Sequence, residues 1–215
     1  MGGSFNPIHH GHLIVARAVA EHLGLERLTL VPALGAPHKL LVEDGPQVCL
    51  PTPQQRLEMI RLAIAGDELF ELSEIELRRR PPSYTIDTLH ELRQTHGAEA
   101  RLYWIVGADM LADLPNWHRA DEVVEAATIV TAARPPWTRR MPEILARLRT
   151  RFSPQQVDRL AAAVAPTPLV EITSTQIRHR LRLGQSVRYL TPPGVVDFMA
   201  RAGLYRPATG ATETP

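Results

Sequence analysis

Apolar positions along the chain recur with two different spacings, and they predict helices and strands in alternation. Apolar residues three and four positions apart predict helices, whereas short continuous apolar runs predict buried strands. The expected helices cover residues 12–23, 54–65, 85–95 and 120–127, with two more from Ser174 and Pro193, and the expected strands cover 28–31, 69–77, 102–106, 128–131 and 169–172. This order predicts an α/β fold, a Rossmann-like doubly wound parallel sheet with helices on both faces.

The remaining segments, a long loop, a stretch near residue 150 and a tail, interrupt or follow this alternation. A loop over residues 32–53 is rich in Pro and Gly, and loops of that length in a compact domain tend to be functional. The stretch 137–166 is expected to be helical in pieces. Residues 207–215 are expected to form a disordered tail. The length of 215 residues fits one α/β domain.

Composition excludes several classes of protein. Lys and Arg number 24 against 23 Asp and Glu, which argues against an extended nucleic-acid-binding face. No apolar run approaches the ~20 residues of a membrane helix, and the start lacks the features of a signal peptide. A single cysteine, Cys49, suits a reducing compartment. We therefore expect a cytoplasmic protein without nucleic-acid or membrane partners, and the oligomeric state, a homo-oligomer included, stays open.

The segment at residues 2–12 reads Gly-Gly-Ser-Phe-Asn-Pro-Ile-His-His-Gly-His and precedes the first expected helix. Glycines let a backbone approach a ligand closely, and a helix start offers N–H groups to an anion. His9 and His12, three residues apart, can point the same way and donate to phosphate oxygens. A turn with solvated histidines and a metal site remain alternatives, although no Cys or carboxylate lies within the segment.

A second candidate anion site lies in Ile-Thr-Ser-Thr-Gln-Ile-Arg, residues 172–178. The hydroxyls of Ser174 and Thr175 precede Arg178 by about one helical turn, so hydroxyls, helix-start amides and a guanidinium would gather at one point. Simple helix capping beside a solvated Arg explains the pattern equally well.

Four further segments carry candidate groups, each with an alternative interpretation. Lys39, the only Lys among 24 basic residues, is suited to hold a polyphosphate but is also an ordinary loop residue. Asp109, after Gly107, is suited to accept ribose hydroxyls or to cap a helix. Trp117 is suited to stack on a base or to fill the core. The segment 83–85 is typical of a helix cap.

These segments together resemble the H-x-G-H nucleotidylyltransferase superfamily, whose two signatures match G-G-S-F-N-P-I-H-H-G-H-L and I-T-S-T-Q-I-R. With P-H-K, S-Y-T-I-D-T-L, I-V-G-A-D, L-P-N-W-H and G-L-Y, the chain is similar to the bacterial nicotinate-nucleotide adenylyltransferases. The similarity runs from residue 2 to about 205. It implies one nucleotidylyltransferase domain over residues 1–206 that transfers the adenylyl group of ATP to nicotinate mononucleotide, giving deamido-NAD and pyrophosphate in NAD biosynthesis.

The resemblance also implies a role for each matching residue. The catalytic residues would be His9, His12, Lys39 and Arg178. ATP would contact Gly2, Gly3, Ser4, Phe5, Gly107, Asp109, Ser174, Thr175 and Arg134, and nicotinate mononucleotide would contact Tyr84, Thr85 and Trp117. Because the attacking phosphate is already an anion, positioning and charge neutralisation suffice without a general base. Mg²⁺ would enter with ATP, without a metal site of the protein itself.

The sequence departs from the superfamily at its start. Members carry a short apolar strand before the Gly-Gly turn, whereas Met1 directly precedes Gly2 here. We therefore expect the first strand to be missing, with unpaired backbone on two neighbouring strands and a slot in the core. We favour a start codon upstream of Met1.

Other functions remain open at this point. The acceptor is alternatively nicotinamide mononucleotide or another phosphate such as phosphopantetheine. A non-catalytic nucleotide-binding homologue is a second alternative. A tRNA-binding synthetase fragment shares the H-x-G-H pattern, but the balanced charge and short length argue against it.

Overall fold

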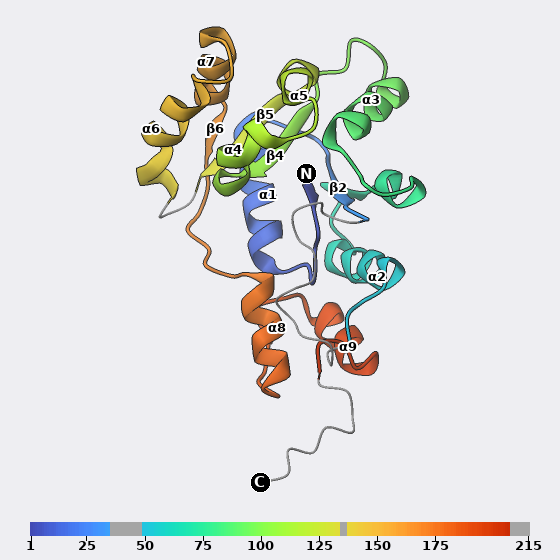
Figure 1. Ribbon diagram of the computed structural model, residues 1–215. Coiled ribbons are helices and arrows are strands. Elements are labelled where there is room, and N and C mark those ends of the chain that lie inside the picture. Colours follow the sequence, from blue (N-terminus) through green and yellow to red (C-terminus); the bar gives the residue numbers. More distant parts are fainter. Residues whose placement is uncertain (35–48, 134–136, 207–215) are drawn as a thin grey trace.

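Strands alternate with helices along residues 1–34, 49–133 and 137–206, the parts of the chain that the computed structural model describes (Figure 1). The strands are β1 (Gly2–Gly3), β2 (Leu28–Pro32), β3 (Phe70–Leu72), β4 (Tyr103–Gly107), β5 (Thr128–Ala133) and β6 (Val164–Pro166). Hydrogen bonds join them into two three-stranded sheets, β1-β2-β3 and β4-β5-β6, in which every pair is parallel. The predicted parallel α/β architecture is confirmed.

The helices begin and end close to their expected positions. They are α1 (His10–Leu23), α2 (Pro53–Ile64), α3 (Thr85–His96), α4 (Ala108–Asp113), α5 (Ala120–Ala126), α6 (Trp137–Leu148), α7 (Pro154–Ala162), α8 (Ser174–Arg182) and α9 (Pro193–Arg201), with 3-10 turns at Ile75–Arg78 and Leu114–Asn116. Local chemistry fixes the ends: Gly24 stops α1 in the left-handed conformation at φ 61°, and Thr52 caps α2 by accepting from the N–H of Gln55.

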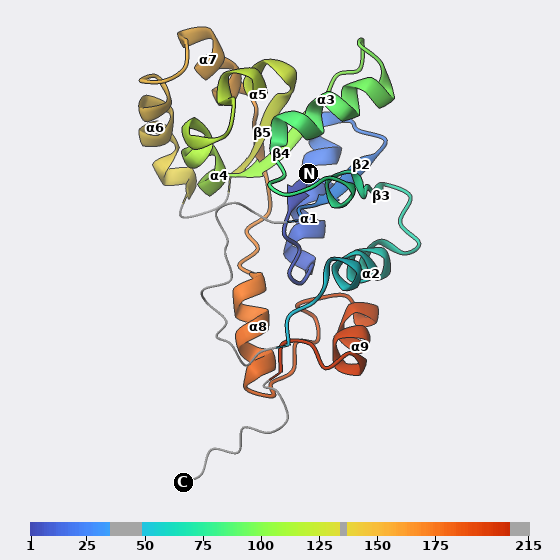
Figure 2. The ribbon, with the colours of Figure 1, turned by 45° about the vertical axis from the view of Figure 1, so that its right-hand side comes forward.

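The core has two parts, one on each face of the sheets. Along β5, Ile129 and Ala133 belong to a cluster under α3–α7, whereas Val130 and Ala132 belong to a cluster with α1, α2, α8 and α9. Successive strand residues point to opposite faces, so one strand serves both clusters. Figure 2 shows the same division, with α8 and α9 at the end of the molecule opposite α6 and α7.

The first strand is short, and the expectation that it is missing is corrected. Gly2 and Gly3 themselves form β1, where the N–H groups of Val31 and Ala33 donate to the carbonyls of Met1 and Gly3. In the described residues β1 pairs with β2 alone. Beside Met1 lies a hollow of about 170 Å³, lined from β2 and β4 by Leu28, Thr29, Tyr103, Trp104 and Ile105. The expected slot is therefore present.

The expected strand at 169–172 is wrong. The outer partner of β5 is β6, which pairs Val164–Pro166 with Thr131–Ala133. The register of this pair runs to Ala133 opposite Pro166, residues 169–172 form no strand in the structure, and Leu169 is 60% exposed. The expected strand at 69–77 also shortens, to β3 and the turn Ile75–Arg78.

The predictions for the stretch 137–166, the loop 32–53 and the tail 207–215 have different outcomes. The stretch 137–166 forms α6 and α7 and then β6, so the prediction of helical pieces is confirmed for its greater part. Most of the loop 32–53 and all of 207–215 lie outside the described residues. None of the helices in the described parts is long and apolar enough to cross a membrane.

Candidate active site

The start of α1 is built by a reciprocal pair of histidines. The backbone N–H of His12 donates to Nδ1 of His9 at 3.3 Å, and the N–H of His9 donates to Nδ1 of His12 at 3.2 Å. The two rings stack with centroids 3.6 Å apart. Because Nδ1 accepts in both rings, a neutral imidazole carries its proton on Nε2. Each ring is therefore set to donate from Nε2, as phosphate oxygens require.

This pair also corrects one expectation about the helix start. The N–H groups at the start of this helix are expected to face an anion, but the N–H of His10 donates to Leu190 O at 3.0 Å and that of His12 donates to Nδ1 of His9. The imidazoles, rather than these two amides, are the donors that this end of α1 presents. The parts of the chain that the structure describes contain no group of three or more His, Cys, Asp and Glu side chains that could hold a metal ion.

Gly11 and Phe5 shape the surroundings of the rings. A Cβ on Gly11 would lie 3.0 Å from Nδ1 of His9 and 3.2 Å from Ile172 O, so the residue between the histidines needs to be small. Phe5 is 1% exposed, and its ring meets that of His12 edge-on at 5.1 Å. The side chain of Phe5 therefore belongs to the core, and only its backbone is available for a nucleotide.

The turn between β1 and α1 is held through its carbonyl oxygens. Four side chains from distant parts of the chain each donate to one carbonyl at 2.8–3.0 Å: Arg56 to Ser4, Arg178 to Asn6, Ser174 to Pro7 and Thr191 to Ile8. In addition, the hydroxyl of Tyr205 donates to Oδ1 of Asn6 at 2.5 Å. The turn is thus preorganised by tertiary contacts that converge on four carbonyls between Ser4 and Ile8.

The second predicted anion site is brought to this same turn. Thr173 caps α8 by accepting from the N–H of Gln176 at 3.1 Å, so the capping interpretation holds for that residue. Ser174 and Arg178 instead donate to the turn, and Arg178 also donates to Oγ1 of Thr175 at 3.4 Å. Arg178 is 9% exposed, which contradicts a solvated side chain.

The glycines at the ends of β1 and β4 are required by close contacts. A Cβ on Gly2 would lie 2.6 Å from Cζ2 of Trp104, and one on Gly3 would lie 3.1 Å from the ring of Phe5. Gly107 ends β4 directly under the carboxylate of Asp109, which would meet any Cβ there. Asp109 is exposed and α4 has no side-chain cap, so the capping interpretation of Asp109 is wrong.

The start of α3 lies beside the segment that follows α4, although the two are far apart in sequence. The rings of Tyr84 and His118 stack with centroids 4.1 Å apart. The neighbouring Trp117 packs against the core, while its buried Nε1 has no hydrogen-bond partner. The helix starts at Thr85 without a side-chain cap, which contradicts the prediction that residues 83–85 form one. Ser83 donates to Glu76 O instead.

A buried carboxyl lies beneath this helix start. Glu76 is 5% exposed, and its Oε1 accepts from the hydroxyl of Thr88 at 2.8 Å. Burial raises the pKa of the Glu76 carboxyl, and the Thr88 hydrogen bond, Arg79 and the Met1 amine oppose that rise. Glu76 therefore ties the 3-10 turn Ile75–Arg78 to α3 and supports the position of Tyr84.

Two predicted site residues, Lys39 and Arg134, lie outside the described residues. Sequence analysis missed Arg56 and Thr191 and gave Tyr205, within G-L-Y, no role. For Arg56 a signal exists, because it lies three and four residues before Met59 and Ile60 on the buried face of α2. An Arg on an apolar helix face calls for a functional or structural explanation.

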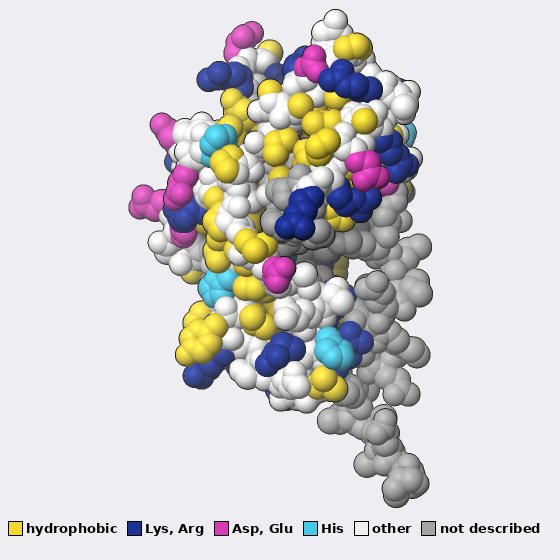
Figure 3. Space-filling model, turned by 90° about the vertical axis from the view of Figure 1, so that its left-hand side faces the viewer, with side chains coloured by type: hydrophobic (Ala, Val, Ile, Leu, Met, Phe, Trp, Pro, Cys, Tyr) yellow, Lys and Arg dark blue, Asp and Glu magenta, His cyan; other side chains and the backbone are white. Residues whose placement is uncertain are grey.

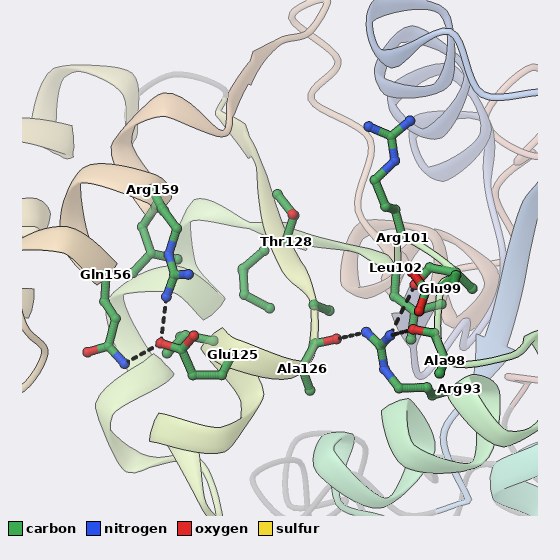
Figure 4. A pocket seen from close by; sticks show the side chains of 15 residues that line it. Arg93, Ala98, Glu99, Arg101, Leu102, Glu125, Ala126, Thr128, Gln156 and Arg159 are labelled. Atoms are coloured by element: carbon green, nitrogen blue, oxygen red, sulfur yellow. Dashed lines mark hydrogen bonds and ion pairs between the residues drawn. The ribbon is translucent and has the colours of Figure 1, made fainter.

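The more spacious of the two described hollows, about 340 Å³, lies away from these residues (Figure 4). It opens at the amino ends of β4 and β5, and four of the side chains that line it take part in hydrogen bonds within it. Arg93 donates to the carbonyls of Ala98, Ala100 and Ala126, while Arg159 and Gln156 both donate to Glu125. The candidate site residues therefore lie away from this hollow, toward the opposite, carboxyl ends of the strands.

Figure 3 shows basic and acidic side chains interspersed over the face that carries α6 and α7.

Comparison with known proteins gives a consistent result. The family model described as "Cytidylyltransferase-like" matches residues 1–180. A probable nicotinate-nucleotide adenylyltransferase from Thermomicrobium roseum is 39% identical, over 95% of this chain and 89% of its own length. One with the same description from Yersinia enterocolitica is 38% identical, over 95% and 93%.

Solved structures show the same fold at lower identity. The nicotinic acid mononucleotide adenylyltransferase of Plasmodium falciparum, complexed with NaAD, superposes with a TM-score of 0.67 at 16% identity. The match covers 95% of this chain and 94% of that one. The fold inferred from strand order thus has a solved counterpart.

Proposed function

The chain belongs to the cytidylyltransferase-like family, and on that premise we propose that it is a nicotinate-nucleotide adenylyltransferase. It transfers the adenylyl group of ATP to nicotinate mononucleotide, with deamido-NAD and pyrophosphate as products, a step of NAD biosynthesis. The curated relatives carry this description at 38–39% identity over 95% of the chain. The enzyme is a nucleotidyltransferase.

The observation that carries the proposal is the reciprocal pair His9 and His12. Two stacked imidazoles with Nε2 as donor, next to a turn fixed by five side chains, form a rigid donor array for phosphate oxygens. Preorganised donors of this kind stabilise charge that develops on phosphate in the transition state. We assign His9 and His12 to the α-phosphate of ATP and its transition state.

The remaining ATP contacts surround this pair. Arg178, Ser174 and Thr175 approach the turn from α8, and Gly2, Gly3, Ser4 and the Phe5 backbone form its wall. Gly107 and Asp109 at the end of β4 are assigned to the adenosine. Lys39 is assigned to the triphosphate and Arg134 to the nucleotide by sequence alone.

The acceptor site is assigned to the start of α3. An uncapped helix N-terminus leaves backbone N–H groups for a carboxylate, and the helix dipole favours negative charge there. We assign Thr85 and the backbone at Tyr84 to the nicotinate carboxylate, and the face of Trp117 that does not pack on the core to the pyridine ring. A carboxylate benefits from this environment more than an amide does, which supports nicotinate over nicotinamide.

The reaction needs no covalent intermediate. A phosphate oxygen of nicotinate mononucleotide attacks the α-phosphorus of ATP in line, the new P–O bond forms, and the bond to the β-phosphate breaks to release pyrophosphate. Mg²⁺ belongs to the ATP substrate and neutralises charge on the phosphates. It would enter with the nucleotide, and the described residues hold no group of three or more His, Cys, Asp and Glu side chains that could bind it.

The proposed partners are these two nucleotides, and the proposed compartment is the cytoplasm. The single Cys49 supports a reducing environment. Near-balanced charge supports small nucleotides over nucleic acid as ligands.

The test is pyrophosphate release with ATP, Mg²⁺ and one acceptor at a time. Nicotinate mononucleotide is expected to give the highest kcat/KM, with deamido-NAD identified by mass. Nicotinamide mononucleotide and phosphopantetheine are the matched alternatives, and a higher kcat/KM with either would replace the proposed acceptor. ATP binding without pyrophosphate release from any acceptor would indicate a non-catalytic homologue. Removal of Mg²⁺ by chelation is expected to abolish turnover.

A further inference from the structure

Arg56 is a buried cation without a carboxylate partner. It is 8% exposed on the inner face of α2, and no acidic side chain of the described residues lies within ion-pair distance of it. The ion pairs present in these residues all involve other arginines, such as Arg61 on the same helix, which pairs with Glu58 and Glu74. Burial of an uncompensated charge is costly, so this position calls for an explanation.

The contacts of Arg56 connect two segments that border the site. Nη1 donates to Ser4 O at 2.8 Å, and Nη2 donates to Leu34 O at 3.5 Å. Ser4 follows β1 and Leu34 follows β2, so the guanidinium joins the carboxyl ends of neighbouring parallel strands. Both acceptors are neutral carbonyls, so within the described parts of the chain no carboxylate pairs with the charge of Arg56.

The bond to Ser4 also fixes a donor on the other side of the turn. A trans peptide directs its C=O and the next N–H oppositely. Because Arg56 holds Ser4 O, the N–H of Phe5 is directed away from the guanidinium. Phe5 adopts φ 44°, an uncommon conformation for a non-glycine residue, so this orientation needs support from outside the turn.

We infer that Arg56 is a positioning residue for the polyphosphate of the nucleotide, acting through the Ser4 peptide and through its uncompensated charge. The inference deepens the proposed function and rests on it for the identity of the ligand as ATP. An anion bound at the turn would supply a countercharge that no carboxylate of the described residues provides. Burial lowers the pKa of Arg56, yet a guanidinium stays protonated at neutral pH.

The experiment measures binding of inorganic tripolyphosphate by calorimetry, a probe that needs neither acceptor nor turnover. Arg56→Gln keeps a donor for Ser4 but removes the charge, and it is expected to weaken binding ~10-fold or more. Arg56→Lys keeps the charge and is expected to stay within about 3-fold of the wild type. Arg61→Met, on the same helix but exposed, is the control and is expected to change nothing.

Three results would overturn the inference: no tripolyphosphate binding by the wild type, unchanged binding by Arg56→Gln, or equal losses in the Gln and Lys variants. Kinetics supply a second measurement. Any rise in KM of Arg56→Lys is expected for ATP and not for nicotinate mononucleotide. Equal rises in KM for ATP and for nicotinate mononucleotide in Arg56→Lys would indicate a merely structural role. This measurement decides the question even if Arg56→Gln does not fold. Binding without turnover by the wild type would refute the proposed function alone.

Discussion

The rings of His9 and His12 stack 3.6 Å apart while each Nδ1 accepts the backbone N–H of the other residue. One pair of side chains therefore performs two tasks. It caps α1, and because both Nδ1 atoms accept, it leaves Nε2–H as the donor of each neutral ring. Capping and catalysis can be separated experimentally, because asparagine caps a helix well but lacks an equivalent of Nε2–H.

His9→Asn is expected to lower kcat roughly 10²-fold, the effect of losing one transition-state donor, and to leave the unfolding free energy within about 0.5 kcal/mol of the wild type. His9→Ala removes donor and cap together, so it is expected to lose the same activity and about 1 kcal/mol of stability as well. Turnover assays and urea denaturation measure the two effects. Normal turnover in His9→Asn would exclude the assigned role.

Tyr205→Phe tests the side-chain support of the turn. The hydroxyl donates to Oδ1 of Asn6 at 2.5 Å, and Tyr205 is fully buried, so removal of the hydroxyl takes this donor away from a partly buried acceptor. We expect the unfolding free energy to fall by about 1–3 kcal/mol. Tyr189→Phe is the matched control, because Tyr189 is 86% exposed, and it is expected to have no effect. Equal stability of both variants would contradict the assigned hydrogen bond.

Trp117→Ala tests the acceptor site. Loss of the stacking ring is expected to raise KM for nicotinate mononucleotide by about 10-fold or more, with KM for ATP nearly unchanged. Trp137→Ala, which removes an indole on α6, serves as the control and is expected to leave both KM values unchanged. A rise in KM for ATP alone would mean that Trp117 contacts ATP and not nicotinate mononucleotide.

Glu76→Gln tests the buried carboxyl under α3. Burial raises the pKa of Glu76 in the folded protein above the 4.5 of the exposed group, so the folded state binds the proton more tightly. This contribution to stability is complete below the unfolded-state pKa and is lost as pH rises through the folded-state pKa. We expect the wild type to lose stability relative to Glu76→Gln over that window in urea titrations. If the wild type instead gained stability relative to Glu76→Gln with rising pH, the contacts of Glu76 with Arg79 and Thr88 would outweigh burial in setting its pKa.

Sequence predicted helices well where local signals define both ends. The helix from residue 12 stops at Gly24, and the segments from Ser174 and Pro193 begin as expected, because caps and apolar spacing act within one or two turns. The strand expected at 169–172 failed for the opposite reason. Pairing depends on which distant segment lies beside β5, which here is β6, and no local pattern around Leu169 contains that information.

The sequence by itself determined the parallel α/β class and the residue types of the candidate site. The alternation of strands with helices along the chain and the spacing within the two motifs, His9 to His12 and Ser174 to Arg178, are local properties. Only the tertiary structure decided what these groups touch. It turned Arg178 and Ser174 toward the carbonyls of the turn, and it brought Arg56 and Tyr205 to the same place. Such contacts join residues up to 199 positions apart, and burial against distant elements, rather than neighbouring sequence, selects them.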